Sequence, residues 1–350
     1  MSQGSFDYKK AGVDIDTADA AKEEMKAAMA AKDPRVLNSL GAFASLYDLS
    51  KFPGIKNPVL VMKMEEPGSK QLLAAQEGRL ASVGLDLIHH VINDTVVMGA
   101  KPLAIQDSII CGKLEKDMVV KLVATMAAAC RENGCDLVGG ETSEQPRVLP
   151  AGSYILNACC VGIVDRDRIV DGSKVVPGQV VLAVASNGVH TNGYTLVRSI
   201  LDANPNLRTE IVGGEKFIDA VLKPHLCYNL ALQELFGISE LPVTGLAHIT
   251  GGGIVDNFER ILPETVAATL DLSKVSVLPV FSAIKRAGNV PEQDMLRTFN
   301  LGVGLCVVVS ADKVKLVSDV FRKHQHQVYP IGETMRRDSA AIKLIGKLNF

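Results

Sequence analysis

Polar side chains recur at helical spacing along GLDLIHHVINDTVVMGA, residues 84–100. Asp86, His90, Asn93 and Asp94 follow one another at intervals that place them on one face of a helix. Carboxylate and amide oxygens near the carboxyl end of such a helix are suitable ligands for Mg²⁺ and its waters. An ordinary solvated helix face has the same spacing, so the pattern by itself leaves both interpretations open.

Glycine is concentrated in four segments that we expect to be turns: residues 139–142, 186–188, 191–193 and 250–253. Glycine lets a backbone approach an anion closely and adopt a positive φ, which suits phosphate binding as well as tight turns. Four polar side chains accompany these segments: Glu141, His190, Asn192 and His248. A loop histidine such as His190 can polarise a phosphate or transfer a proton, although a histidine bonded only to backbone fits the same position.

Several enzyme classes find no support in the motifs. The sequence has neither GxxxxGK[ST] nor a clean GxGxxG frame, so no P-loop or Rossmann nucleotide site is predicted. The absence of GxSxG argues against a serine hydrolase. Four further histidines show no spacing typical of ligands and are expected at the surface: His89, His225, His324 and His326.

Hydrophobic periodicity predicts alternating helices and strands in both halves of the chain. Helices are expected over residues 20–32 (with Thr17 as N-cap), 82–98, 117–132, 216–222, 229–236, 281–287 and 311–324, and from Tyr194. Strands are expected over residues 58–64, 102–110, 154–164, 180–186, 267–272, 304–310 and 327–334, the first of them buried. Residues 1–16 are expected to form an extended arm, and residues 39–46 a loop. The polar stretch 171–179 indicates a domain boundary or long turn.

Composition narrows the class of protein. Hydrophobic residues make up 47% and charged residues 22%, as in a globular protein, and a formal net charge of −2 argues against general nucleic-acid binding. We expect no membrane span and no secretory signal, because no sufficiently long apolar run occurs. Seven scattered cysteines without a CxxC pair argue against a disulfide framework or a cysteine zinc cluster, and indicate buried thiols in a reducing cytoplasm.

Longer motifs follow one another in order along almost the whole chain. They include YKKAGVDID (8–16), GCDLVGGETSEQP (134–146), SNGVHTNGYTLVRSIL (186–201), HITGGGIVDNFERILP (248–263) and MLRTFNLGVG (295–304). The ordered set resembles the phosphoribosylformylglycinamidine cyclo-ligases, also called aminoimidazole ribonucleotide synthetases. Any one motif is shared with related families, whereas the opening and the closing motif favour this one.

The resemblance implies a fold of the α+β, or mixed α/β, class, with a mixed sheet covered by helices in each of two domains. Residues 1–170 would form an ATP-binding and dimerisation domain that pairs in a homodimer, and residues 171–350 an α/β domain that completes the substrate site. The implied reaction is ATP-dependent closure of formylglycinamidine ribonucleotide to aminoimidazole ribonucleotide, with release of ADP and phosphate, in cytoplasmic purine biosynthesis. Acidic metal ligands and glycine-rich phosphate sites suit such chemistry.

Carried over motif by motif, the resemblance assigns catalytic roles to Lys26, Asp94, His190 and Asn192. Lys26 would cover the triphosphate, and His190 with Asn192 would meet the substrate. The residues assigned to ATP and its phosphates are Ser69, Lys70, Asp107, Gly139, Gly140, Thr142, Gly251, Gly252 and Gly253. The acidic ligands assigned to Mg²⁺ are Glu65, Asp94 and Glu141.

The loop after the first strand departs from the family pattern. The family usually has Thr-Asp-Gly-Val-Gly-Thr-Lys there, whereas this chain has MEEPGSK, residues 64–70. Glu65 replaces the aspartate with a longer side chain, and Pro67 removes a backbone donor. Altered nucleotide affinity is the mild consequence. The alternative is a catalytically weakened nucleotide-binding paralogue with a regulatory or scaffold role, and Glu66 competes with Glu65 for the metal-ligand position.

Overall fold

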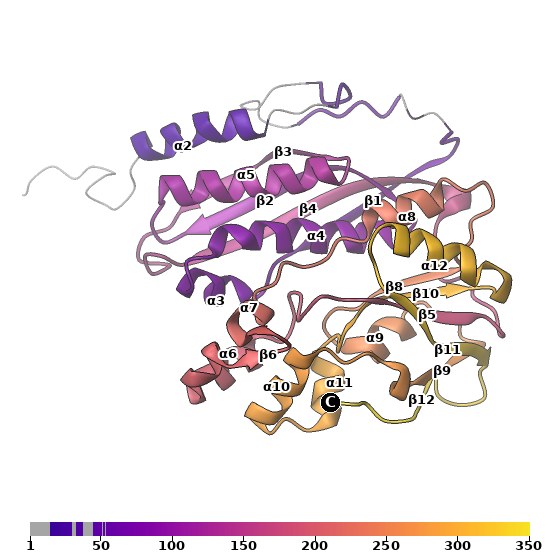
Figure 1. The fold of residues 1–350 in the computed structure, drawn as a ribbon. Coiled ribbons are helices and arrows are strands. Elements are labelled where there is room, and N and C mark those ends of the chain that lie inside the picture. The colour runs from indigo at the N-terminus through magenta and orange to yellow at the C-terminus, as the bar shows by residue number, and fades with distance from the viewer. Residues whose placement is uncertain (1–14, 30–32, 38–44, 51, 53) are drawn as a thin grey trace, which may run out of the picture. The chain divides into compact units, whose positions relative to one another are not determined.

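The computed structural model describes residues 15–29, 33–37, 45–50, 52 and 54–350. Its contacts divide the chain into two units (Figure 1). Unit 1 runs to Ile92 and includes Pro102–Ile163, and unit 2 comprises Asn93–Lys101 and Val164–Phe350. A single division after residue 170 remains the prediction for the domain limits, while the contacts group the short segment 93–101 with the second half of the chain.

Unit 1 contains a four-stranded sheet in the order β1-β4-β2-β3. The strands are β1 (Pro58–Glu65), β2 (Lys101–Cys111), β3 (Asp136–Glu144) and β4 (Tyr154–Asp165). β2 and β3 are parallel, and α5 (Lys116–Glu132) connects them, as the long connection between parallel strands requires. Among the described residues, α2 (Ile15–Ala28), α3 (Lys70–Gln76) and α4 (Val83–Val96) are further α-helices that begin in this unit.

Helix α2 packs on α5 (Figure 1). Its Ala21 and Met25 are buried, and the Arg131 guanidinium on α5 donates to the backbone oxygen of Ala28 at 2.7 Å. An ion pair between Lys116 and Glu24 adds a second polar contact between the two helices. These contacts hold Lys26, on the last turn of α2, next to the sheet.

The two faces of the unit 1 sheet differ in exposure, because the burial of side chains alternates along its strands. Strand β1 exists as predicted, but the expectation that it is buried is wrong. Leu60 is 46% exposed, Met62 71% and Met64 65%. β1 is an edge strand, so its outward apolar side chains have a neighbouring strand on one side only.

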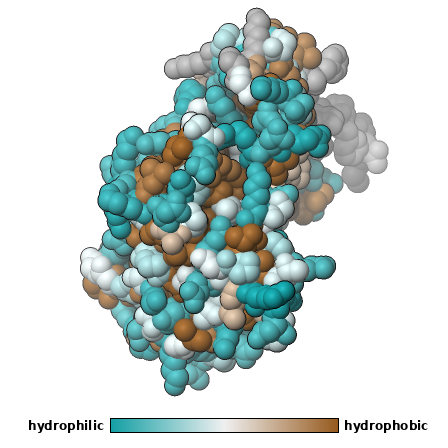
Figure 2. Space-filling view, turned by 90° about the vertical axis from the view of Figure 1, so that its right-hand side faces the viewer, coloured by the Kyte–Doolittle hydropathy of each residue, from teal (hydrophilic) through white to brown (hydrophobic). Residues whose placement is uncertain are grey.

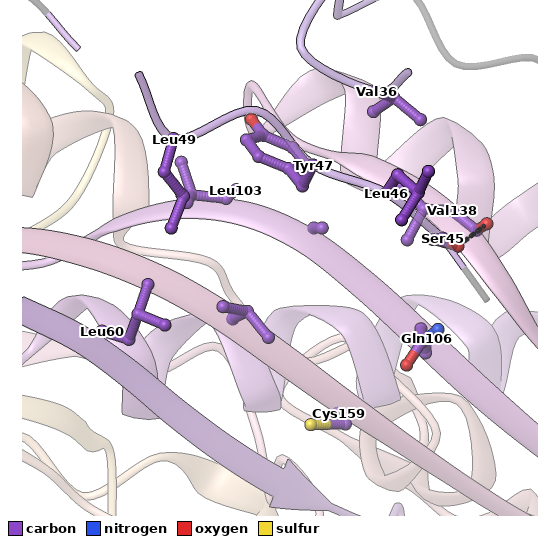
Figure 3. Close-up of a pocket in the computed structure, with 12 residues that line it drawn as sticks. Val36, Ser45, Leu46, Tyr47, Leu49, Leu60, Leu103, Gln106, Val138 and Cys159 are labelled. Atoms are coloured by element: carbon purple, nitrogen blue, oxygen red, sulfur yellow. Dashed lines mark hydrogen bonds between the residues drawn. The ribbon is translucent and has the colours of Figure 1, made fainter. Parts of the chain in front are cut away.

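A segment from the N-terminal part of the chain lies over part of this same face. Ser45, Leu46, Tyr47 and Leu49 border an apolar cavity of about 220 Å³ whose floor is formed by the sheet (Figure 3). The Ser45 hydroxyl donates to the backbone oxygen of Val138 at 2.7 Å and so fixes one end of the segment to β3.

Unit 2 contains a six-stranded sheet in the order β12-β9-β11-β5-β10-β8. Its strands are β5 (Val180–Ala185), β8 (Gly245–His248), β9 (Val266–Asp271), β10 (Val303–Val309), β11 (Val328–Arg336) and β12 (Ile342–Ile345). All neighbouring pairs are antiparallel except β12 with β9. The hairpin β6 (Ile211–Val212) and β7 (Glu215–Lys216) forms a separate small sheet.

The helices of unit 2 are α6 (Tyr194–Ala203), α7 (Phe217–Val221), α8 (Asn229–Phe236), α9 (Gly253–Glu259), α10 (Pro279–Gly288), α11 (Glu292–Thr298) and α12 (Val314–Lys323). Apolar side chains of α8, α12 and the central strands form one buried cluster, which includes Leu182, Leu232, Val307 and Phe321. Leu246 anchors strand β8 in this core, and the last residue of the strand, His248, belongs to the site described below.

Most predicted elements are confirmed, with two local corrections. The first helix spans Ile15–Ala28, so Thr17 lies inside it and is not its N-cap. Residues 139–142 form part of strand β3 and are not a turn. Residues 1–14 of the predicted arm over residues 1–16, and most of the predicted loop over residues 39–46, lie outside the described residues. Residues 15 and 16 belong to α2, so the prediction of an arm is wrong there.

On the face shown in Figure 2, hydrophilic side chains surround the hydrophobic ones. Within the described residues, no helix is both long and apolar enough to cross a membrane. The seven cysteines are free thiols, of which Cys159 and Cys227 are partly exposed. The prediction of buried thiols is confirmed for the other five cysteines and is wrong for these two.

Candidate functional site

Unit 1 contains a cavity of about 290 Å³ that gathers several of the predicted phosphate and metal residues. Lys26 from α2, Asp107 from β2, and Gly140, Glu141 and Thr142 from β3 line it. We call it the carboxylate cavity. The remaining lining residues are Lys22, Met25, Met29 and Val123. The parallel pairing of β2 with β3 places Asp107 beside Gly140 at this cavity, and the packing of α2 on α5 adds the lysines.

Asp107 lies directly opposite Gly140 in the register of the two strands. A methyl group on residue 140 would lie only 2.3 Å from Asp107 Oδ1, so glycine leaves the space that this carboxyl group occupies. Asp107 is 8% exposed, and burial raises its pKa to about 7. A cation in the cavity would favour the ionised carboxylate, since opposite charge offsets the cost of burial.

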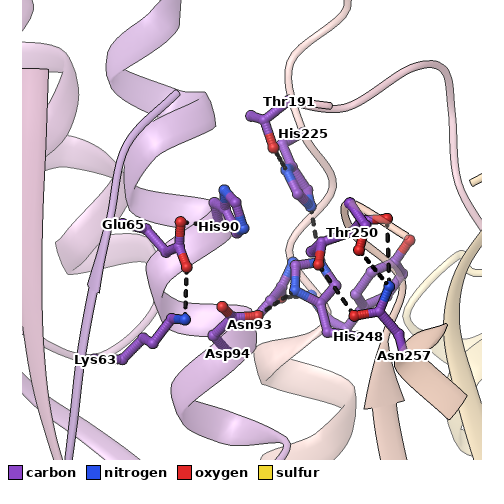
Figure 4. Close-up of polar contacts among 12 residues, drawn as sticks. Lys63, Glu65, His90, Asn93, Asp94, Thr191, His225, His248, Thr250 and Asn257 are labelled. Atoms are coloured by element: carbon purple, nitrogen blue, oxygen red, sulfur yellow. Dashed lines mark hydrogen bonds and ion pairs between the residues drawn. The ribbon is translucent and has the colours of Figure 1, made fainter. Parts of the chain in front are cut away.

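The loop that departs from the family pattern engages other partners. Glu65, at the end of β1, pairs with Lys63 at 2.6 Å and lies 3.8 Å from His90 Nε2 (Figure 4). Lys70 is fully buried, and its Nζ donates to Asp86 Oδ1 at 2.7 Å. Burial lowers the pKa of Lys70, an effect that Asp86 opposes. The residues that line the carboxylate cavity include neither of these side chains, nor Ser69 or Gly139.

Unit 2 gathers three histidines from different parts of the chain. His190 precedes α6, His225 precedes α8, and His248 ends β8. The Nε2 atoms of His225 and His248 are 3.0 Å apart, and the rings of His190 and His225 stack with centroids 3.9 Å apart. All three are at most 5% exposed. We call His190, His225 and His248 the histidine cluster.

Asp94 and Thr191 contact the outer nitrogens of this cluster (Figure 4). Asp94 Oδ1 lies 2.6 Å from His248 Nδ1, and Thr191 Oγ1 lies 3.5 Å from His225 Nδ1. A carboxylate in this position fixes the orientation and tautomer of an imidazole. The structure therefore links Asp94 to His190 through His248 and His225, and the surface location predicted for His225 is wrong.

The polar face of α4 is buried, although the helix itself matches the prediction. Asp86 is 0% exposed, His90 5% and Asn93 1%, so the solvated-face interpretation is wrong. Asn93 uses both ends of its amide: Oδ1 accepts from the Tyr228 backbone N–H at 2.9 Å, and Nδ2 donates to the Leu226 oxygen at 2.8 Å. Asn93 thereby holds the segment that carries His225.

The glycine turn after β8 lies beside Asn192. A Cβ atom on Gly251 would lie 3.2 Å from Asn192 Oδ1. Gly252 and Gly253 have φ of +95° and +68°, a conformation that side chains disfavour. The structure therefore brings the predicted substrate-end residues and this turn together within unit 2.

Two asparagines that the sequence analysis did not single out organise these turns. Asn257 Nδ2 donates to the backbone oxygens of Gly251 at 3.0 Å and Gly253 at 2.8 Å. Asn300 Nδ2 donates to the Gly188 oxygen at 3.0 Å, and its Oδ1 accepts from Ser186 Oγ at 2.9 Å. Asn257 lies in the family motif HITGGGIVDNFERILP and Asn300 in MLRTFNLGVG, and this membership is the only feature of the sequence that marks them.

The predicted acids thus fall into two groups. Glu141 lines the carboxylate cavity of unit 1, whereas Asp94 contacts the histidine cluster of unit 2. Glu65 belongs to unit 1 and pairs with Lys63. The convergence of these acids on one cation remains a prediction.

Comparison with known proteins covers both units. The family model described as AIR synthase related protein, N-terminal domain, matches residues 55–164, and the corresponding C-terminal domain model matches residues 176–345. A phosphoribosylformylglycinamidine cyclo-ligase of Chromobacterium violaceum is 41% identical over 339 residues, which cover 96% of this chain and 97% of that protein. The chain belongs to the phosphoribosylformylglycinamidine cyclo-ligase family.

Solved structures with the same fold extend beyond this cyclo-ligase family. Escherichia coli HypE has a TM-score of 0.66 at 19% identity, and the aligned region covers 94% of this chain and 94% of that one. A hydrogenase maturation protein HypE in complex with ATP has a TM-score of 0.60 at 18% identity, covering 89% of this chain and 87% of that one. At such identities the likeness establishes the fold alone. The two-domain fold of mixed sheets with helices, predicted from the sequence, is confirmed.

Proposed function

We propose that this chain catalyses the ATP-dependent ring closure of formylglycinamidine ribonucleotide to aminoimidazole ribonucleotide, a step of purine biosynthesis. The observation that carries the proposal is the similarity to a cyclo-ligase over 96% of the chain. The cytoplasmic location expected from the sequence accompanies the proposal as a prediction.

In the proposed reaction the γ-phosphoryl group of ATP passes to the formyl oxygen of the substrate, and ADP leaves. The amidine nitrogen then attacks the activated carbon, the carbon–oxygen bond breaks, phosphate departs, and the nitrogen loses a proton. Such chemistry depends on positioning and on neutralising the charge of the phosphoryl group.

The carboxylate cavity provides groups that fit the phosphate end of ATP. The carboxyl groups of Asp107 and Glu141 and the hydroxyl of Thr142 are oxygen donors of the kind that Mg²⁺ prefers, and the bound ion would neutralise phosphate charge. Lys26, whose side chain is 44% exposed on α2, lines the same cavity and would contact an anion bound there. Lys70 and Glu65 have other partners here, and their assigned roles rest on the resemblance alone.

We assign proton transfer to the histidine cluster. His190 and Asn192 belong to one loop, and Asp94 acts on the cluster through His248. We assign the substrate end to this loop and to the turn at Gly251. A neutral imidazole in such a position can accept the proton that the amidine nitrogen loses.

The homodimer implied by the resemblance finds a candidate surface in the outward face of β1. Leu60, Met62 and Met64 form an exposed apolar edge, and such edges mark interaction surfaces. We expect the mass of a dimer in light scattering after gel filtration, and a monomer for Met62→Glu. Met98→Glu, at an exposed methionine of unit 2, is the matched control and should remain dimeric. The mass of a single chain for the wild type would exclude this dimer.

The activity is tested directly with purified protein, formylglycinamidine ribonucleotide, ATP and Mg²⁺. ADP should appear in a 1:1 ratio with aminoimidazole ribonucleotide, and each should require the other substrate. ADP release without the ribonucleotide product, from folded protein, would reject the proposed reaction.

A nucleotide-binding protein without turnover is the second candidate. The pairing of Glu65 with Lys63 and the burial of Lys70 on Asp86 favour it, because Glu65 has a partner other than a metal ion and Lys70 a partner other than phosphate. Calorimetry separates the two candidates: ATP binding without product formation supports the second, whereas binding with turnover supports the first.

A further inference from the structure

The histidine cluster has the composition of a transition-metal site. His190, His225 and His248 each offer one ring nitrogen, and these three atoms all lie within 4.8 Å of one another. Imidazole nitrogen suits Zn²⁺ and similar ions, whereas Mg²⁺ prefers oxygen. The three histidines come from distant segments of the chain, so only folding brings them together.

The spacing of two of the nitrogens is close to what a tetrahedral ion requires. The Nε2 atoms of His225 and His248 are 3.0 Å apart. Two nitrogens that each lie about 2.05 Å from Zn²⁺ at a tetrahedral angle are separated by roughly 3.3 Å. A small outward movement of either ring, together with a turn of the His190 ring out of its stack on His225, would bring one nitrogen of each histidine around a single ion.

Partners on the far side of two rings match the usual surroundings of metal-bound histidines. Asp94 Oδ1 lies 2.6 Å from His248 Nδ1, as in carboxylate–histidine–metal arrangements, and it brings negative charge to the site. Thr191 Oγ1 lies 3.5 Å from His225 Nδ1. In both histidines it is thus Nε2 that faces into the cluster.

The backbone of His190 is held in an unfavourable conformation. Its φ is +62°, a left-handed value that is uncommon for residues other than glycine. The Tyr194 hydroxyl donates to the His190 backbone oxygen at 3.1 Å and helps to maintain it. Strain of this kind collects at functional sites, where it places a side chain that relaxed backbone would direct elsewhere.

We propose that His190, His225 and His248 bind one Zn²⁺-class ion, with Asp94 and Thr191 as outer partners. Three protein ligands leave a fourth position for water or for an atom of a ligand. Binding does not depend on the proposed ring closure. One consequence does rest on it: an ion on His190 would occupy the imidazole lone pair and inhibit the reaction.

Cobalt provides a direct test, because tetrahedral Co²⁺ absorbs visible light. Full-length protein, freed of metal with a chelator, is titrated with Co²⁺ and then with Zn²⁺. We expect visible d–d bands that saturate at one ion per chain, disappear on addition of Zn²⁺ and persist in excess Mg²⁺. The near-ultraviolet band of cobalt–thiolate bonds should be missing, which excludes binding by Cys159 or Cys227.

Variants test the ligand set. His225→Gln should weaken Co²⁺ binding by about 100-fold or more, since even outer partners of a metal ligand contribute 10–100-fold. His324→Gln is the matched control: His324 lies outside the cluster, 2.8 Å from Glu234, and its loss should leave Co²⁺ binding unchanged. Thermal unfolding verifies that both variants are folded.

The wild-type titration decides the matter even if His225→Gln fails to fold. The lack of tetrahedral bands in the wild type, or equal Co²⁺ affinity in folded His225→Gln, would overturn the proposal. Neither reading uses enzyme activity, so failure of the metal site and failure of the proposed ring closure are distinguished.

Discussion

The carboxylate cavity of unit 1 and the histidine cluster of unit 2 differ in both ligand chemistry and exposure. The cavity presents Asp107, Glu141 and Lys26 to a space of about 290 Å³. The cluster packs its three imidazoles against one another out of contact with solvent. Oxygen donors and a lysine suit a hydrated ion and a charged phosphate, whereas buried nitrogens suit proton transfer or a softer ion. The comparison indicates that one chain keeps two separate kinds of polar chemistry on two units.

The largest effect on stability is expected at Lys70, which pairs with Asp86 and does not line the carboxylate cavity. Lys70→Ala removes one member of a fully buried ion pair and leaves Asp86 uncompensated, which costs about 3–5 kcal/mol of the free energy of unfolding. Chemical denaturation measures this cost. Lys315→Ala breaks an exposed pair with Asp319 and should leave the free energy of unfolding almost unchanged. Equal costs would show that Lys70 is not a structural lysine.

Replacement of Asp107 tests the cavity itself. Asp107→Asn should lower kcat/KM roughly 10²–10³-fold, the typical cost of losing one preorganised electrostatic contact. Wild-type activity that is retained in the folded variant would remove Asp107 from the site.

The same variant has a defined pH dependence of stability. The pKa of Asp107 is about 7 in the folded protein, above the value of 3.8 for the free group, because the residue is buried. The folded state therefore holds the proton more tightly, and this contribution to stability is present below pH 3.8 and decreases as the pH rises to about 7. Wild type should lose up to a few kcal/mol relative to Asp107→Asn over this interval. Parallel pH profiles in urea unfolding would contradict the assignment.

Asp94 tests the histidine cluster in the same way. Asp94→Asn removes the charge that orients His248, so we expect a loss of about 10–100-fold in activity. The solvated-face interpretation would make Asp94 a surface carboxylate with little influence on stability. The structure gives it a 2.6 Å contact with a buried ring, so a loss of about 1–3 kcal/mol should accompany the change. Steady-state kinetics and denaturation, measured on the same preparation, separate the two effects.

Replacement of Lys26 should have the smallest effect on binding and stability. It should also distinguish the carboxylate cavity from the histidine cluster most clearly. Lys26→Met removes an exposed cation whose pair with Glu23 contributes about 0.5 kcal/mol at most, so the fold should be unaffected. The Kd for ATP should rise about 10-fold, which corresponds to about 1.4 kcal/mol. Co²⁺ binding should remain unchanged, whereas His225→Gln should show the reverse pattern. A change of both properties in either variant would mean that the two sites are coupled.

Periodicity and motif order were sufficient for much of this molecule. The helix predicted over residues 229–236 has those limits in the structure, and α4 differs from its predicted range by only a few residues. Such elements depend on local spacing of apolar side chains, which the sequence displays. The motif order likewise predicted the family, because it extends over both units.

Three features were not predicted from the sequence because they depend on contacts between distant segments. Residues 139–142 form a strand despite two glycines, since pairing with β2 supplies the hydrogen bonds that local preference does not. The outward side chains of β1 are exposed because the strand lies at an edge, which its own composition cannot reveal. The amides of Asn257 and Asn300 bind turns through contacts that no spacing rule describes.

The sequence by itself determined the family, the alternation of helices and strands, and the identity of the acids and histidines. Only the tertiary structure decided which of them meet. It placed His225 between His190 and His248, buried Lys70 on Asp86, and separated Glu141 from Asp94 into different units. The reason is physical: the environment of a polar side chain is set by groups far away in the chain, and burial gives these contacts their strength.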